Sequence, residues 1–126
     1  MVKKPVTKPK SPKRGEIWLV NFDPTIGSEI NKTRPAIIIQ NNIGNKYSPV
    51  TIVAAITSAT PNEKMYPTEV LIPCGTGGLT NDSLILLNQI RTVDKTRLVK
   101  RLGALPTTLL QKVSTSIQIS LDTIGI

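Results

Sequence analysis

The chain contains no histidine and a single cysteine, Cys74, among its 126 residues. The lack of histidine excludes Ser–His and Cys–His nucleophilic sites and any histidine general acid or base. One cysteine excludes an internal disulfide framework, agrees with a reducing cytoplasm and argues against a Cys/His zinc site. Any chemistry must therefore use Arg, Lys, Asp, Glu, Ser, Thr or backbone groups.

Aromatic residues and long apolar runs are also scarce. Aromatics make up 3% of the chain, so Ile, Leu and Val must build the core. The longest apolar runs are about five residues, far short of the roughly 18 or more that cross a bilayer. Lysines near the N-terminus are followed by no apolar segment, which excludes a secretory signal. The length predicts one domain with a single core. The short apolar runs predict that the protein has no membrane partner.

The net charge of +8 is concentrated at the N-terminus. Residues 1–13 hold five lysines and no acid, whereas the remainder holds 11 basic and 8 acidic residues. Pro5, Pro9 and Pro12 also interrupt this segment, so the sequence predicts a disordered tail over 1–13 and a folded domain over 14–126. The tail is either a solubilising extension or a non-specific anchor for nucleic-acid phosphates.

Apolar patterns predict five or six short strands. Turn-forming residues over 41–45 and a mobile, glycine-rich loop over 73–81 separate some of them. A kink or bulge is expected around Asn88, between the last two strand pieces. The predicted strands cover residues 15–22, 35–40, 49–57, 68–72, 83–87 and 89–93.

Two helices are predicted near the C-terminus. Asp94 is a plausible N-cap for a short helix over Lys95–Arg101, with Gly103 at its exit. Pro106 fits the first turn of a last helix. Apolar residues recur there at spacings of three or four, at Leu110, Val113, Ile117, Leu121 and Ile124. Short strands followed by one amphipathic helix predict a small, strongly bent sheet or a partly open barrel closed by helices.

Arg34 stands where the long polar loop over 23–33 meets the apolar run Pro35–Ile39. A continuous apolar run is typical of a strand that is buried on both faces. A charge at such a position is either paired for structure or directed at a ligand. The residue types alone do not decide between these two roles.

Six segments of the sequence form a pattern in a fixed order. They are Lys13-Arg14-Gly15-Glu16-Ile17-Trp18, Asp23-Pro24-Thr25 with Gly27-Ser28-Glu29, Arg34-Pro35-Ala36-Ile37-Ile38-Ile39, Gln40-Asn41-Asn42-Ile43-Gly44-Asn45, Ala54-Ala55-Ile56-Thr57-Ser58 and Gln89-Ile90-Arg91-Thr92-Val93-Asp94-Lys95. No segment alone is specific, but together they resemble the MazF/PemK family of toxins from toxin–antitoxin pairs, which are sequence-specific endoribonucleases. The resemblance covers residues 13–122, and the middle segment is similar to the Gram-positive MazF branch.

The resemblance implies a mainly β fold, an SH3-like β-barrel with a C-terminal amphipathic helix, that forms a homodimer. It implies RNA cleavage that needs no metal or cofactor, by attack of the ribose 2′-OH on the adjacent phosphate. The products would carry a 2′,3′-cyclic phosphate and a 5′-OH. The resemblance also implies an antitoxin protein as partner, whose acidic, partly disordered segment would cover the basic RNA site.

The family's catalytic pair corresponds to Arg34 and Thr57, and Glu29 matches a glutamate implicated in some relatives. Another branch uses an aspartate where the nearest residue here is Asn88, and an amide cannot act as that base. Arginine offers a planar fork of donors for phosphate oxygens, and threonine adds one hydroxyl donor. The group that deprotonates the 2′-OH stays open between Glu29, water and the substrate.

Polar loop residues are the expected readers of single-stranded RNA, through hydrogen bonds to base edges. Each is also a common turn former, so a purely local role is the alternative for every one. The candidates are Ser28, Asn31, Lys32, Thr33, Asn88 and Gln89.

Two other functions of the same fold class stay open at this stage. The barrel also serves gyrase poisons, which bind a topoisomerase and lack nuclease chemistry. A non-catalytic RNA-binding module is the third alternative. Arg34, Thr57 and the Gly-Ser-Glu loop favour the nuclease.

Overall fold

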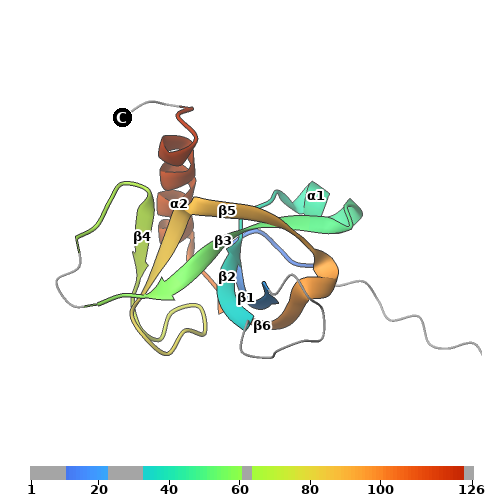
Figure 1. Cartoon of the computed structure of the whole chain (residues 1–126), viewed down its shortest axis with the longest axis horizontal. Helices are drawn as coiled ribbons and strands as arrows, with labels where there is room; N and C mark the ends of the chain where they lie inside the picture. The colour runs from blue at the N-terminus through green and yellow to red at the C-terminus, as the bar shows by residue number, and fades with distance from the viewer. Residues whose placement is uncertain (1–10, 23–32, 61–63, 124–126) are drawn as a thin grey trace, which may run out of the picture.

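The computed structural model describes residues 11–22, 33–60 and 64–123 (Figure 1). Ser28, Glu29, Asn31 and Lys32 lie outside these residues, as do residues 1–10 of the tail. The elements are β1 (Glu16–Asn21), β2 (Thr33–Ile38), α1 (Asn42–Tyr47), β3 (Val50–Ser58), β4 (Glu69–Ile72), β5 (Ser83–Asp94), the 3₁₀ turn η2 (Lys95–Arg97), β6 (Leu98–Ala104) and α2 (Thr107–Ser120).

The strands form one six-stranded antiparallel sheet in the order β4-β5-β3-β2-β1-β6. It bends strongly, and α2 stands against its β4 and β5 part (Figure 1). The prediction of a mainly β fold with a C-terminal helix is confirmed. Within the described residues the sheet stays open, because β4 and β6 form separate edges and do not pair.

The bent sheet carries a hydrophobic core on each face. Ala36, Ile37 and Ile38 in β2 are all fully buried, as expected for a continuous apolar run. Since side chains alternate along a strand, Ile37 joins one core, whereas Ala36 and Ile38 join the other. Strand β2 is thereby fixed from both sides.

Helix α2 closes the larger of these cores. Val113 is fully buried, and Leu110 and Ile117 pack beside it, so most of the predicted apolar stripe is confirmed. Ser116, predicted to lie outside the stripe, is buried and donates its hydroxyl to the Pro67 carbonyl at 2.9 Å. Leu121 is 60% exposed, because the helix ends at Ser120, and Ile124 lies outside the described residues.

The predicted helix over Lys95–Arg101 is wrong beyond its first turn. Asp94 is the cap, as expected, and its carboxylate accepts from the Thr96 N–H at 2.9 Å. This hydrogen bond holds the pKa of the Asp94 carboxyl below its ordinary value. The chain then enters β6, where pairing with β1 replaces the helix that was expected to follow the Asp94 cap. Gly103, expected at the helix exit, lies inside this strand.

Residues 41–45, predicted as turn, instead begin helix α1. The Asn41 carboxamide caps the helix by accepting from the Gly44 N–H at 2.8 Å. Asn45 is buried at its centre and takes part in a closed network with Gln40 and Thr51. Its Oδ1 accepts from Gln40 Nε2 at 3.1 Å and from Thr51 Oγ1 at 2.7 Å, and its Nδ2 donates to the Gln40 carbonyl at 2.9 Å.

The bulge expected around Asn88 is present. Ala54 pairs with Ile90, whereas the next residue, Ala55, pairs with Leu86. Residues 87–89 therefore lie opposite no β3 residue, and the two predicted strand pieces form one bulged strand. In the part of the chain that the structure describes, no helix is both long and apolar enough to cross a membrane.

Candidate active site

The site begins where the pairing of β2 with β3 ends. Ala36 pairs with Ala55, Ile37 with Ala54 and Ile38 with Val53. Pro35 comes next and has no N–H to donate, so the ladder does not extend past it. The same register, continued by two residues, sets Arg34 opposite Thr57. Arg34 and Thr57 therefore stand at the same end of two neighbouring strands.

Arg34 and Thr57 line one open hollow of about 460 Å³, between the ends of these strands and the loop that follows β4. Both side chains are exposed. The Arg34 guanidinium donates from Nη1 to the Thr33 carbonyl at 3.1 Å. The remaining lining residues are Leu19, Pro35, Ile56, Ser58, Gly78, Leu79, Thr80, Asn81, Ser83 and Leu102.

Four residues that line this hollow have exposed polar side chains. Thr57, Ser58, Thr80 and Asn81 are exposed, and their side chains make no hydrogen bond to any residue that the structure describes. Thr57 could have been a strand-end threonine that bonds a backbone group, but its hydroxyl makes no such bond within those residues. The hollow thus offers hydroxyl and amide groups beside one guanidinium.

The charge of the hollow favours an anion. Among its described lining residues Arg34 carries the one charge, and there is no carboxylate. A guanidinium beside hydroxyl donors matches the oxygen pattern of a phosphate group. No group of three or more Cys, Asp or Glu side chains suited to a metal ion occurs in residues 11–22, 33–60 and 64–123.

The predicted RNA-binding residues that the structure describes, Thr33, Asn88 and Gln89, do not line this hollow. Asn88 and Gln89 are exposed at the β5 bulge. Thr33 is partly buried and pairs with Asn21, and its carbonyl accepts the hydrogen bond from the Arg34 guanidinium. Ser28, Glu29, Asn31 and Lys32 belong to the segment outside the described residues, so their roles stay predictions.

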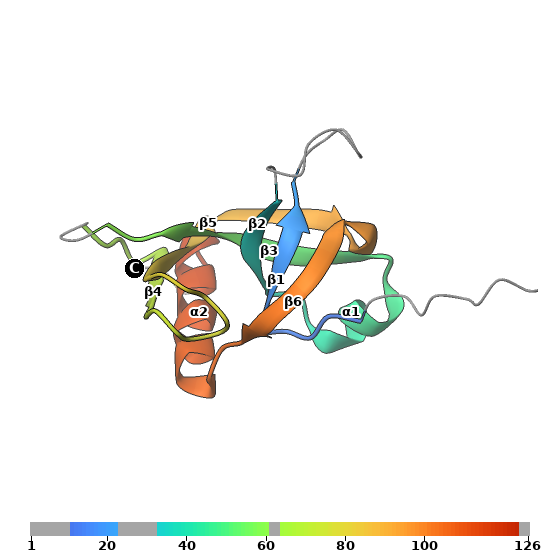
Figure 2. The same cartoon turned by 90° about the horizontal axis from the view of Figure 1, so that it is seen from below.

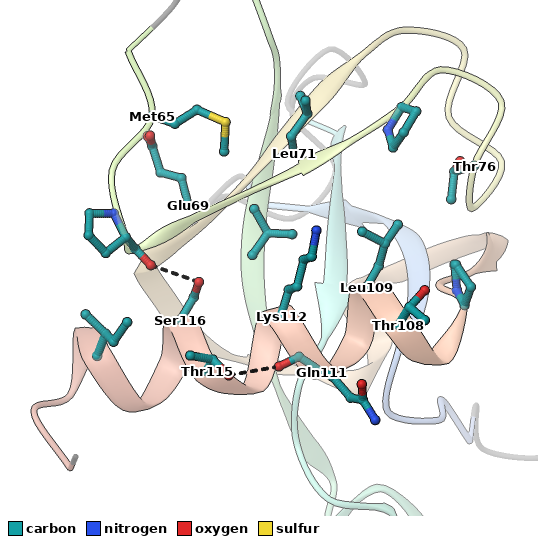
Figure 3. A pocket seen from close by; sticks show the side chains of 15 residues that line it. Met65, Glu69, Leu71, Thr76, Thr108, Leu109, Gln111, Lys112, Thr115 and Ser116 are labelled. Atoms are coloured by element: carbon teal, nitrogen blue, oxygen red, sulfur yellow. Dashed lines mark hydrogen bonds between the residues drawn. The ribbon is translucent and has the colours of Figure 1, made fainter. Parts of the chain in front are cut away.

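A second, larger hollow of about 1020 Å³ lies between α2 and β4 (Figure 3). Met65, Leu71 and Leu109 give it an apolar lining. Two of its helix hydroxyls are bonded to the backbone: Ser116 donates to the Pro67 carbonyl, and Thr115 donates to the Gln111 carbonyl at 3.2 Å. Lys112 and Glu69 both line it, so its described lining carries a carboxylate beside the one cation, whereas the smaller hollow has Arg34 without a described carboxylate.

Ser58, Thr80 and Asn81 were not among the predicted site residues. Ser58 follows Thr57 directly, so its place beside the pair follows from the strand end. Thr80 and Asn81 come from the glycine-rich loop, whose path depends on contacts with β6, far away in the sequence. The density of glycine in that loop is the one sequence signal that points to it.

Comparison with known proteins decides the family. Residues 13–121 match the family described as PemK-like, MazF-like toxin of type II toxin-antitoxin system. The chain belongs to this family. The predicted family is thereby confirmed, and the match begins where the lysine-rich tail ends.

Two relatives with the name endoribonuclease are similar over most of their length. Endoribonuclease EndoA of Bacillus subtilis is 45% identical over 109 residues, which cover 86% of this chain and 93% of that protein. Endoribonuclease MazF of Staphylococcus saprophyticus is 47% identical over 109 residues, with 86% and 90% covered. These matches confirm the predicted enzyme class, an endoribonuclease.

Solved structures show the same fold. A mycobacterial endoribonuclease in complex with its cognate antitoxin superposes with a TM-score of 0.71 at 22% identity, covering 88% of this chain and 95% of that one. The bent sheet with its terminal helix is therefore the fold of this family.

Proposed function

We propose that this toxin cleaves single-stranded RNA at specific sequences, without a metal ion, at the hollow that contains Arg34 and Thr57. The observation that carries the proposal is that two neighbouring strands lead these residues to the same open, positively charged hollow. The ribose 2′-oxygen would attack the adjacent phosphorus, and the bond to the 5′-oxygen would break. The products would be a 2′,3′-cyclic phosphate and a 5′-OH.

The residues of the hollow suit the charge that develops in this reaction. RNA supplies its own nucleophile, so the protein has to stabilise the extra negative charge on the phosphate oxygens of the transition state. Arg34 would bind these oxygens with its planar fork of donors, and the Thr57 hydroxyl would donate one further hydrogen bond. Since a guanidinium holds its protons, another group must accept the proton of the 2′-OH.

We also propose that the toxin is a homodimer and that a protein antitoxin covers this hollow. The net charge of +8 favours an acidic partner segment, which would neutralise Arg34 and exclude RNA. The mycobacterial relative solved with its cognate antitoxin supports such a partner. Light scattering of the purified chain should give the mass of a dimer, and the mass of a monomer would contradict this part of the proposal.

The proposed reaction is tested by incubating the purified chain with a long single-stranded RNA in EDTA and mapping the product ends. We expect discrete cuts with 2′,3′-cyclic phosphate and 5′-OH ends. Arg34→Ala, analysed in parallel, should cut the RNA far more slowly at the same sites and thereby exclude a contaminating nuclease. Cuts that require added Mg²⁺, or that leave 3′-OH ends, would contradict the mechanism. Intact RNA together with gyrase trapped on DNA would instead support a gyrase-directed poison.

A further inference from the structure

The loop between β4 and β5 forms one wall of the hollow. Gly78, Leu79, Thr80 and Asn81 all line it. Figure 2 shows this loop, in yellow-green, beside the end of β6. The loop follows β4, which is the edge strand at the other end of the strand order. Two sheet edges that do not pair with each other are thereby connected next to the candidate site.

Glycine-to-backbone contacts determine how closely the loop approaches β6. A Cβ atom on Gly78 would stand 2.2 Å from the Leu102 carbonyl oxygen. A Cβ atom on Gly103 would stand 2.6 Å from the Gly77 carbonyl carbon and 3.0 Å from the Gly78 nitrogen. Real side chains do not tolerate such distances to backbone atoms, so these positions need glycine for the loop to lie where it does.

Further contacts hold both ends of the loop. The Cys74 N–H donates to the Asp82 carboxylate at 2.8 Å, and the Ala59 N–H donates to the Asp82 carbonyl at 2.8 Å. Leu79 is 7% exposed and belongs to the larger core. Thr80 and Asn81 are thus presented to the hollow from a loop that is anchored on both sides of them.

The two presented side chains are well suited to reading a base. An asparagine amide offers both donors and an acceptor, and a threonine hydroxyl can do either. Single-stranded RNA exposes the edges of its bases to such groups. Because Arg34 and Thr57 line the same hollow, a phosphate bound there would bring a neighbouring base within range of this wall.

We infer that Asn81, with Thr80 beside it, determines which base the toxin accepts next to the phosphate that it cleaves. The glycine contact of the loop with β6 is the positioning device that keeps both side chains at the hollow. This inference rests on the proposed ribonuclease function and assigns one part of its sequence specificity.

The test compares cut-site preferences on a pool of single-stranded RNAs with randomised positions. Asn81→Ala and Thr80→Val are expected to cut with the same product ends as the wild-type chain. Asn81→Ala should lose about tenfold of the base preference at one position beside the cut, which is the scale of an amide–base hydrogen-bond pair. Gln118→Ala, an exposed amide on α2 that does not line the hollow, is the matched control and should keep the wild-type preference.

The outcomes separate the inference from the function beneath it. If the wild-type chain cuts and Asn81→Ala and Thr80→Val keep its preference at every position, the inference is overturned and the proposed function stands. If the wild-type chain cuts no RNA in the pool, both fail.

Gly103→Ala tests the positioning device separately. The added methyl group must move the loop away from β6, so the variant should relax the base preference at the same position as Asn81→Ala. Urea unfolding gives the free energy of unfolding of this variant and so shows whether it is folded under the conditions of the cleavage assay. A folded Gly103→Ala variant with an unchanged preference would show that this contact does not position the reading side chains.

Discussion

The β2–β3 pair carries polar side chains at both of its ends, and the two ends differ in how these side chains are engaged. At the end next to α1, Gln40 and Thr51 both donate a hydrogen bond to Asn45, and Asn45 is 1% and Thr51 0% exposed. At the other end Arg34 and Thr57 are exposed and face an open hollow.

This difference indicates what each end does. Polar groups that are buried and mutually bonded stabilise the fold, because breaking the network would leave an unsatisfied group inside the protein. Exposed hydroxyl and amide groups that make no hydrogen bond within the described residues, such as those of Thr57 and Asn81, contribute little to stability and can bond a ligand. We therefore propose a structural role for the α1 end and a catalytic role for the hollow end.

The largest effect is expected from removing the charge at the hollow end. Arg34→Ala should slow cleavage by ~10²–10³-fold, or about 3–4 kcal/mol of barrier, as is typical for loss of one key transition-state donor. Arg34→Lys keeps the charge without the planar fork, so its cleavage rate should lie between those of the wild-type chain and Arg34→Ala. Single-turnover cleavage of a synthetic RNA measures both. Wild-type rates in both variants would move the site away from Arg34.

The next effect is expected at the α1 end. Asn45→Ala leaves the Thr51 hydroxyl buried without its acceptor and should lower the free energy of unfolding by about 2–3 kcal/mol. Asn81→Ala removes an equal side chain that makes no hydrogen bond within the described residues, so it should stay within about 0.5 kcal/mol of wild type. Urea unfolding compares them. Equal losses in the two variants would contradict the assignment of roles.

A smaller effect is expected for the second residue of the hollow end. Thr57→Val keeps the shape of a β-branched residue but removes the hydroxyl, and it should slow cleavage by about tenfold. The matched control is Thr92→Val, which changes an exposed strand threonine that does not line the hollow. Cleavage rates for one defined RNA decide the point. If both substitutions slow cleavage equally, the hydroxyl of Thr57 has no special role.

The smallest effect concerns a polar cluster that is engaged but lies at the surface. Partial burial alone would raise the pKa of Glu16, but hydrogen bonds from the Lys13 N–H, Arg101 and Trp18 outweigh it and hold the pKa below its ordinary value of 4.5. The ionised carboxylate therefore stabilises the fold at neutral pH, and this contribution is lost as the pH falls through the lowered pKa.

Glu16→Gln should accordingly be slightly less stable than wild type at pH 7, and the gap should narrow below pH 4.5. Urea unfolding at several pH values measures it. Because the Arg101 side chain is 50% exposed, the loss should be smaller than that of Asn45→Ala. A gap that widens as the pH falls would show that the sign of the pKa shift is wrong.

Much of the fold could be predicted because local pattern and tertiary environment agree. The apolar run Pro35–Ile39 predicted a doubly buried strand, and the break between two strand pieces at Asn88 predicted a kink or bulge. Beyond Arg97 the two conflict: the Asp94 cap and Gly103 predicted a helix up to Arg101, but pairing with β1 makes residues 98–101 part of a strand. A partner strand about 80 residues away cannot be read from local periodicity.

The residues that line the hollow likewise include some that the sequence could predict and some that it could not. Arg34 and Thr57 could be predicted, because a family motif contains each of them, and a resemblance carries over residue by residue. Thr80 and Asn81 could not, because they reach the hollow through backbone contacts between a glycine-rich loop and β6. Asparagine also led to a wrong prediction in another loop. Asn41 and Asn42 predicted a turn, whereas Asn41 caps helix α1.

The central claim is that the hollow end of β2 and β3 does the chemistry and the α1 end holds the fold. Its most direct test measures the RNA cleavage rate and the free energy of unfolding on the same preparations of Arg34→Ala and Asn45→Ala. We predict that Arg34→Ala loses at least ~100-fold in rate and stays within about 0.5 kcal/mol of wild-type stability, whereas folded Asn45→Ala cleaves normally and is less stable. An Arg34→Ala variant that cleaves normally, or that unfolds as readily as Asn45→Ala, would contradict the claim.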